Sequence, residues 1–286
     1  MMRDFAGLFL SNRKALAGLV FLGLFVLVAL LAPLLAPYGP HQNRGEDGRR
    51  FQMLAPPSRE HLLGTTQTSH DIFSQFIYGT RTSLFIGLST GLLTSFISVA
   101  VGLAAGYFGG WVDEVVSFVI NVFLVIPTLV LIIVIATYIR LEGILPIVLV
   151  LALTGWAWGA RVIRAQVLSV RQREYVQAAE VLGERPLAIV FREILPNIIP
   201  LVMATFLSST VAAVLGEASL SFLGLGDLTV VSWGTLLYWA RNSAALLYGA
   251  WWWFLPPGLA IGLLGTALAL LNFAIDEISN PKLRQR

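Results

Sequence analysis

The segment Ser83–Phe108, SLFIGLSTGLLTSFISVAVGLAAGYF, runs without a single Asp, Glu, Lys, Arg or His. A helix of roughly 20 such residues crosses the hydrocarbon core of a bilayer, which is about 30 Å thick. The segment is therefore long enough to span a membrane, and it decides the class of the fold.

Five further runs also lack ionisable residues, and together the six make up nearly half of the 286 residues. They are Ala15–Ala36, Val115–Ile139, Gly143–Ala160, Asn197–Gly216 and Ala250–Ile275. Only 12% of the residues are charged and the mean hydropathy is +0.78, whereas soluble domains have about 25% charged residues. The sequence predicts an all-α polytopic membrane protein with six transmembrane helices. The first run is too long for a signal peptide and lacks a small-residue cleavage pattern, so we expect an uncleaved anchor.

The distribution of Lys and Arg predicts the orientation. If the amino terminus is cytoplasmic, most of the 19 Lys and Arg residues lie on the cytoplasmic side, many of them in the segment Arg161–Pro196. Most of the others lie in Pro37–Arg81, and long outer segments count little in the positive-inside rule. We therefore expect a protein of the cell (inner) membrane with both termini in the cytoplasm.

The sequence shows no site in this chain that would supply the energy for uphill transport. Only two lysines occur, and neither follows the Gly-rich pattern that cradles ATP phosphates. The six apolar runs hold no ionisable residue for a coupling ion, since Glu217 and Asp276 lie at run ends. We therefore expect the energy to come from another polypeptide. An ion-coupled secondary transporter stays open as an alternative, because broken helices with free carbonyls can bind sodium.

The sequence also indicates no enzyme and no metal site. It has no cysteine, and its three histidines, His41, His61 and His70, are too dispersed for a metal cluster, so we expect them to be solvated loop residues. No nucleophile motif or facing pair of acids appears at membrane depth. The net charge of +3 requires no nucleic acid as partner. We predict no catalytic residue, no metal and no cofactor bound by this chain.

Small residues indicate how the helices pack. Glycine pairs at four-residue spacing predict close approach of helices in a compact bundle; they are Gly87/Gly91, Gly102/Gly106 and Gly258/Gly262.

The cytoplasmic segment Arg161–Pro196 has helix start and stop residues at positions that predict a helix–turn–helix elbow. Gly183 suits the left-handed residue that closes a helix over Glu174–Leu182. Pro186 suits the first turn of a second helix through Ile194, and Pro196 is expected to end it. Ala178 and Ala179 leave little bulk at the elbow, so a partner could approach its backbone closely. The alternative is a loop that packs only on its own bundle.

These residues resemble a known motif. Gln177-Ala178-Ala179, followed by Gly183 and then Leu195-Pro196 twelve positions later, is similar to the EAA loop of ABC importer permeases. Gln177 stands where that family has Glu, and Glu193 where it often has Ile. The resemblance implies a coupling helix that sits in a groove of a separate ATPase subunit. The implied coupling residues are Glu174, Gln177, Ala178, Ala179, Glu180, Gly183, Leu195 and Pro196.

Motifs along the rest of the chain narrow the resemblance to the C-type subunit of the dipeptide/oligopeptide branch. They lie in Asn12–Pro37, His61–Leu84, Glu217–Gly226, Ser232–Gly234 and Asn280–Arg284. Thr66, Ser69 and His70 stand where that branch usually has Asp, Gly and Arg. The resemblance implies a type I importer permease fold: an N-terminal segment of residues 1–81 with the first helix and an outer loop, a transmembrane domain 82–276 with the coupling loop at about 161–196, and a cytoplasmic tail 277–286.

The implied function is that of a permease subunit of an ATP-driven importer for dipeptides or oligopeptides, with oligosaccharides, nickel or glutathione as alternative solutes. Its implied partners are a homologous B-type permease that completes the path, two ABC ATPase subunits that carry ATP and Mg, an extracytoplasmic solute-binding protein, and the lipid bilayer.

Two further groups of residues are candidates for roles in transport. Ser95, Thr205, Ser208 and Ser209 belong to polar stripes on the second and fifth runs. Such stripes either line a path or form hydrogen bonds between helices, and the sequence leaves both open. Glu217, Phe222, Gly224 and Trp233 lie between the last two runs, where the resemblance implies an outer re-entrant or gating loop.

Overall fold

The computed structural model describes residues 11–139 and 142–279. The motif Asn280–Arg284 and most of the predicted tail 277–286 lie outside the described residues. Within the described ranges, regular structure is helical apart from two isolated bridges. The helices are α2 Arg13–Leu30, α3 Ala32–Leu35, α4 Ile72–Phe108, α5 Gly110–Val125, α6 Thr128–Tyr138, α7 Ile144–Arg171, α8 Glu174–Val181, α9 Pro186–Ile189, the π-helix η1 Val190–Ile194, α10 Leu195–Phe222, α11 Trp233–Asn242 and α12 Trp251–Ser279.

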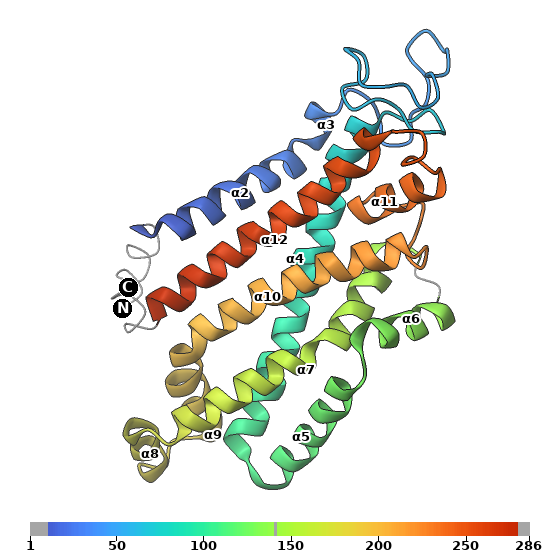
Figure 1. Cartoon of the computed structure of the whole chain (residues 1–286). Coiled ribbons are helices and arrows are strands. Elements are labelled where there is room, and N and C mark those ends of the chain that lie inside the picture. The colour runs from blue at the N-terminus through green and yellow to red at the C-terminus, as the bar shows by residue number, and fades with distance from the viewer. Residues whose placement is uncertain (1–10, 140–141, 280–286) are drawn as a thin grey trace.

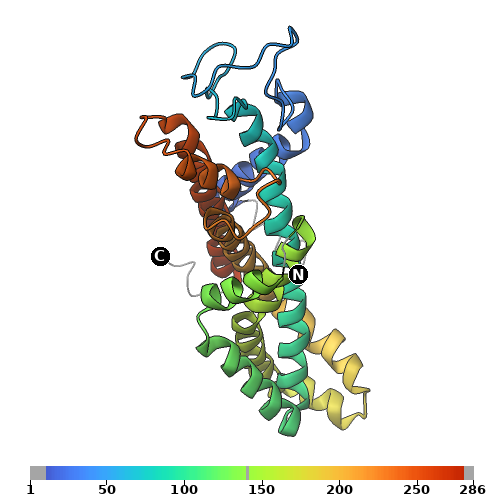
Figure 2. The ribbon, with the colours of Figure 1, turned by 90° about the vertical axis from the view of Figure 1, so that its right-hand side faces the viewer.

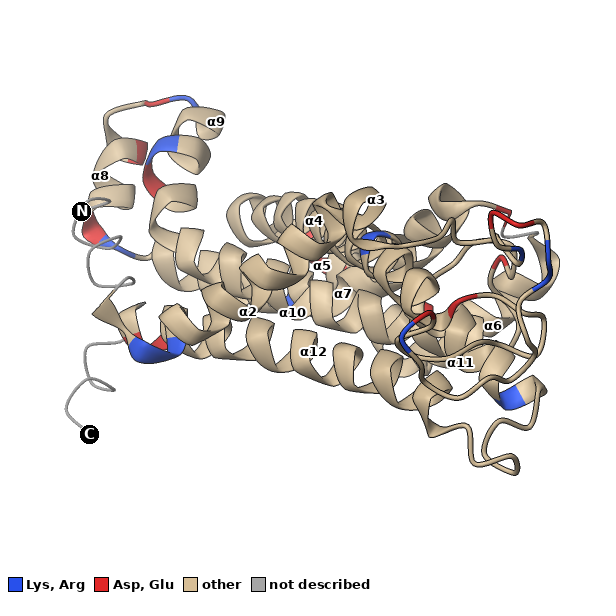
Figure 3. Cartoon of the chain, turned by 90° about the horizontal axis from the view of Figure 1, so that it is seen from above, with Lys and Arg blue, Asp and Glu red and all other residues tan. Residues whose placement is uncertain are grey.

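Five of these helices are long and apolar enough to cross a membrane: α2, α4, α7, the continuous stretch Pro186–Phe222, and α12. The all-α polytopic class is thus confirmed. In Figure 3 most Lys, Arg, Asp and Glu residues of the described chain gather toward the two ends of the long helices. That distribution suits a body whose middle lies in hydrocarbon, where charged side chains are costly.

The predicted third span over Val115–Ile139 is sharply bent. The chain there forms α5 and α6, which meet at an angle of 87°. Pro127 lies at the break, and Ile126 before it is extended (φ −78°, ψ 123°). A proline disfavours helical backbone at the preceding residue, which explains why the helix ends there. The pair forms a sixth span only if the two helices are counted as one.

The expected helix end at Pro196 is wrong. The helix passes through this residue into α10, and the turn before it is a π-helix in which the Leu195 N–H donates to the Val190 carbonyl. Proline has no N–H to donate, and its ring clashes with the preceding helical turn. A wider turn accommodates both effects, because π-helical segments insert one residue into the hydrogen-bond ladder.

Helix α4 lies at the centre of the bundle and contacts α7, α10 and α2 (Figure 1), while α12 packs between α2 and α10. Helix α4 begins at Ile72, well before the predicted Ser83. Asp71 caps its first turn, because the carboxylate accepts the Ser74 N–H at 2.7 Å. The long helix carries the chain from the segment 37–71 to the opposite end of the bundle.

The segment 37–71, which we call the cap, is folded on its own polar core. The expectation of a solvated His61 is wrong, because the ring is buried and its Nδ1 lies 2.8 Å from Asp71 Oδ1. The rings of Phe51 and Tyr38 flank it at centroid distances of 4.6 and 5.5 Å. Asp71 therefore joins the cap to the start of α4.

Two of the three glycine pairs bring helices together. A Cβ at Gly102 would lie 2.8 Å from the Ile163 side chain and 2.9 Å from the Ala160 carbonyl of α7, and Gly91 lies directly against Thr210 of α10. At Gly258 and Gly262 of α12, in contrast, an added Cβ would meet no neighbour within 4 Å. The expected role in helix packing within this chain is therefore wrong for that pair.

These contacts predict opposite effects for two matched substitutions. Gly102→Leu should destabilise the bundle by about 1–3 kcal/mol or more, because the side chain overpacks the α4–α7 contact. Gly258→Leu should leave stability unchanged or raise it, since glycine is a poor helix former. Thermal unfolding of the two detergent-purified variants, followed by tryptophan fluorescence, measures this difference. Equal midpoints would contradict the packing described above.

Candidate functional site

Residues 172–194, which we call the elbow, project from the end of the bundle opposite the cap (Figures 1 and 2). Helix α8 ends in the expected way, since Gly183 has φ +77°. The Glu184 N–H donates to the Ala179 carbonyl at 3.1 Å, and the Gly183 N–H to the Glu180 carbonyl at 3.1 Å. These bonds satisfy carbonyls that the helix end would leave free. The predicted helix–turn–helix is confirmed.

The inner face of the elbow packs on the bundle. Val176, Ala179, Ile189, Val190 and Ile194 form one apolar core with residues of α4 and α7, namely Leu103, Tyr107, Ile163, Val167 and Val170, and with Ile198 of α10. Leu195 contacts the same core. The elbow is therefore fixed to three long helices at once.

Of the two alanines expected to leave room for a partner, only Ala178 lies on the surface. Ala179 is only 8% exposed and belongs to the inner core, whereas Ala178 is exposed. The helical turn explains the difference, because neighbouring residues point about 100° apart. Glu174, Gln177 and Glu180 are exposed as well. A partner that approaches closely can reach Ala178 and not Ala179.

An apolar surface covers the outer side of the elbow. Val181 is 87% exposed and Leu182 81% exposed, and Leu187 and Phe191 are also exposed. We call Ala178 and these four residues the elbow face. Exposed apolar patches of this kind mark contact sites with other proteins or membranes.

An ionic contact supports the elbow from the side. Arg171 at the end of α7 lies 3.6 Å from Glu180 of α8, and its guanidinium lies 5.5 Å from the centre of the Tyr107 ring. A second pair, Arg164 with Asp113, joins α7 to α5 through two hydrogen bonds, one of them 2.6 Å long. These contacts join α4, α5, α7 and α8 near one end of the bundle.

Three of the four candidate path residues lie together. Thr205, Ser208 and Ser209 of α10 line a cavity of about 640 Å³. Ser95 does not line it: the side chain is buried in α4, and its Oγ has no hydrogen-bond partner in the described chain. The cavity therefore groups the three residues of α10 and leaves out Ser95, and the role of the three residues in a translocation path stays a prediction.

Further residues line this cavity. Thr90 and Thr94 of α4 belong to the polar stripe predicted on the second run, whereas Trp158 of α7 and Asn272 and Asp276 of α12 were not predicted. Asn272 donates to Ser208 Oγ at 3.1 Å. A signal for Asn272 existed, since it is the one amide in the run Ala250–Ile275. Nothing in the sequence marked Trp158 as a cavity residue, because tryptophan is also common at the interface between membrane and water.

At the outer end, Glu217 joins α10 to α11. The side chain is 2% exposed, and its Oε1 accepts hydrogen bonds from Ser221 at 2.8 Å and Ser232 at 2.6 Å. Ser232 also caps α11 by accepting the Thr235 N–H at 3.1 Å. The sequence placed Glu217 at the end of a span and therefore did not predict that its side chain is buried. In the structure the helix continues beyond Glu217 to Phe222.

The other outer-loop candidates fix the same junction. Trp233 is fully buried, and it donates from its backbone to Ser83 Oγ at 3.1 Å and from its indole to Thr80 Oγ1 at 3.3 Å. Gly224, with φ +78°, closes α10. The Phe222 ring lies 5.1 Å from the Arg241 guanidinium. Helix α11 is thus attached to both α4 and α10. No group of three or more potential metal ligands occurs among the described residues.

Comparison with protein families gives two matches. Residues 98–285 match the binding-protein-dependent transport system inner membrane component family. Residues 1–57 match the N-terminal transmembrane domain of oligopeptide transport permease C. Together the matches cover most of the chain.

Individual relatives agree with these families. The oligopeptide transport system permease protein OppC of Bacillus subtilis is 31% identical over 97% of this chain and 88% of the relative. The dipeptide transport system permease protein DppC of the same species is 32% identical over 96% of this chain and 84% of the relative. The di/tripeptide transport system permease protein DppC of Pseudomonas aeruginosa is 34% identical over 99% and 93%.

A solved structure shares the fold. A chain of the inward-facing MetNI methionine ABC transporter superposes with a TM-score of 0.57 at 20% identity, over 74% of this chain and 97% of that chain. The likeness shows the type I importer permease fold that the sequence motifs implied.

The Glu217 junction predicts a matched pair of stability effects. Ser232→Ala should destabilise the protein by about 1–3 kcal/mol, because it removes the cap of α11 and one hydrogen bond to a buried carboxyl group. Ser219→Ala, close to the junction but on the exposed side of α10, should have little effect. Limited proteolysis of the connection between α10 and α11 in detergent-purified protein tests both. Equal cleavage rates would contradict the role of the junction.

Proposed function

The chain belongs to the binding-protein-dependent transport system inner membrane component family, and from this premise we propose that it is the C-type permease subunit of an ATP-driven importer of dipeptides or oligopeptides. The observation that carries the proposal is the exposed apolar elbow face on a segment packed firmly on its own bundle. The relatives named for oligopeptide and dipeptide transport support a peptide solute over oligosaccharides, nickel or glutathione.

The elbow face is the proposed docking site of a separate ATPase subunit, and a second ATPase would dock on the partner permease. ATP and Mg would bind to these subunits. The inner core of the elbow joins α4, α7 and α10, so that a displacement of the elbow moves these helices together. In this mechanism ATP binding draws the two elbows toward each other, the two permeases rock to open outward, and hydrolysis resets them.

The cavity lined by Thr205, Ser208 and Ser209 is the proposed half of a translocation path. Trp158 on its border is exposed, and we propose that a homologous B-type permease covers this side. The hydroxyl groups of these three residues can form hydrogen bonds with the backbone of peptides of varied sequence. A solute-binding protein would deliver the peptide at the outer end. The domain limits 1–81, 82–276 and 277–286 belong to the same proposal.

Orientation can be tested by cysteine labelling, since the natural sequence has no cysteine. The proposed topology has both termini and the elbow in the cytoplasm. Arg59→Cys in the cap should react with a membrane-impermeant maleimide in intact cells. Glu184→Cys in the elbow should react only after permeabilisation. The reverse pattern would overturn the orientation.

Coupling can be tested at Ala178. Ala178→Arg should abolish association with the ATPase subunits and reduce peptide uptake at least about tenfold, because a long charged side chain is placed on the elbow face. The protein should still insert and fold, as Ala178 is exposed. Ala178→Ser, nearly equal in size, is the matched control and should behave as wild type. Co-purification and uptake in proteoliposomes of the assembled transporter give the measurement, and unchanged uptake by Ala178→Arg would argue against the proposal.

A further inference from the structure

Two adjoining hollows lie at the outer end, between the cap, the outer part of α4 and the connection from α10 to α11. Their volumes are about 330 and 580 Å³. They share the lining residues His41, Thr229, Val230 and Val231, so they adjoin each other, and we call the two hollows together the outer groove. The groove is separate from the cavity proposed as half of the path.

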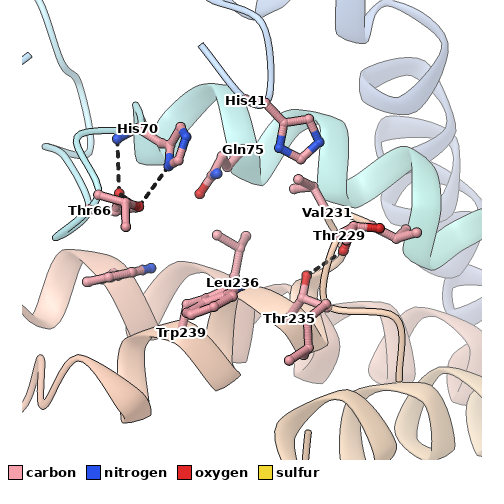
Figure 4. Close-up of a pocket in the computed structure, with 13 residues that line it drawn as sticks. His41, Thr66, His70, Gln75, Thr229, Val231, Thr235, Leu236 and Trp239 are labelled. Atoms are coloured by element: carbon pink, nitrogen blue, oxygen red, sulfur yellow. Dashed lines mark hydrogen bonds between the residues drawn. The ribbon is translucent and has the colours of Figure 1, made fainter. Parts of the chain in front are cut away.

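One end of the groove is aromatic and uncharged. Leu236 and Trp239 lie on one side, and Thr66, His70 and Gln75 lie opposite (Figure 4). Trp253 also lines this end. Among the described residues that line this end there is no Asp, Glu, Lys or Arg.

Two polar features of this end fit an uncharged peptide group. His70 Nδ1 lies 2.8 Å from Thr68 Oγ1, and burial, with a further contribution from His41, lowers the pKa of His70, which favours a neutral imidazole. The indole Nε1 of Trp253 is buried without a hydrogen-bond partner in the described chain. A buried donor without an acceptor is costly, and a bound peptide carbonyl would supply one.

The other end of the groove holds a cation. Arg81 of α4 lines it together with Tyr78 and Thr82. Arg81 is exposed, and its guanidinium has no ion pair or hydrogen bond within the described chain. A free guanidinium on a concave wall binds carboxylates in a bidentate manner.

The spacing of the two ends fits a short extended peptide. Gln75 at the aromatic end and Arg81 at the other end are six residues apart on α4, a rise of about 9 Å. Extended chain covers about 3.3–3.6 Å per residue, so about three residues would bridge this distance.

We propose that the outer groove receives the carboxyl-terminal end of a peptide solute, with the terminal carboxylate on Arg81 and a preceding apolar side chain in the aromatic end. This inference rests on the proposed function as a peptide importer. The occupant is the solute, because hollows of a few hundred Å³ hold a few residues, whereas a stable contact between proteins buries about 1,600 Å². The groove would hold a peptide at the outer surface before it enters the path.

The test uses the full chain in lipid nanodiscs and two probes, the tripeptide Trp-Ala-Ala and its carboxyl-terminal amide. Saturation-transfer NMR titrations should show the free acid binding about tenfold more tightly than the amide, since a charge-assisted hydrogen bond contributes about 1.5–3 kcal/mol. Arg81→Gln should remove this preference and Arg81→Lys should retain some of it. Arg59→Gln, an exposed arginine of the cap outside the groove, is the matched control and should keep it.

A second variant tests the aromatic end. Trp239→Ala should weaken binding of acid and amide by the same factor and leave their ratio unchanged. Equal binding of the two probes to wild type, no binding of either, or a preference that survives Arg81→Gln would overturn the inference. A substitution in the groove that changes the affinity for a solute-binding protein and leaves the affinity for the peptide unchanged would also overturn the inference. Peptide uptake by the assembled transporter without any preference for a free carboxylate would contradict this inference and leave the proposed function standing. Binding of Trp-Ala-Ala without peptide uptake would contradict the proposed function.

Discussion

The packing of α8 on the end of α7 is the contact on which the mechanism depends. Val176 and Ala179 lie in the same apolar core as Val167 and Val170, and Arg171 reaches Glu180 beside them. A loop without this core would absorb a displacement by changing its own shape. Because the core extends to Leu103 of α4 and Ile198 of α10, a displacement of the elbow is shared by the helices that line the central cavity.

Much of the fold follows from the sequence, because a bilayer imposes a strict length on apolar helices. The runs that became α2, α4, α7, α10 and α12 were predicted for this reason, and Gly183 was predicted because few other residues adopt its backbone conformation. The errors concern features that depend on neighbours. Pro127 lies at a break between two helices, whereas Pro196, which follows a π turn, lies within a continuous helix.

The candidate site was predicted only partly, for a similar reason. Sequence spacing located the elbow, and the contact with the bundle decided that Ala179 faces inward while Ala178 faces outward. A hydroxyl stripe does not reveal its role either, since Thr205 lines the cavity and also donates to the Leu201 carbonyl one turn earlier. The burial of Glu217 could not be predicted from the sequence, because it depends on a hydrogen bond from Ser232, which is 15 residues away and next to another helix.

The proline within the continuous helix Pro186–Phe222 has a mechanical consequence. Pro196 has no N–H, so the ladder of backbone bonds is interrupted where the elbow meets α10. Ile194 and Ile198 are buried on either side of the missing bond, so their packing helps to hold the two parts of the helix together. With one backbone hydrogen bond fewer, we expect this point to bend more easily than an uninterrupted helix.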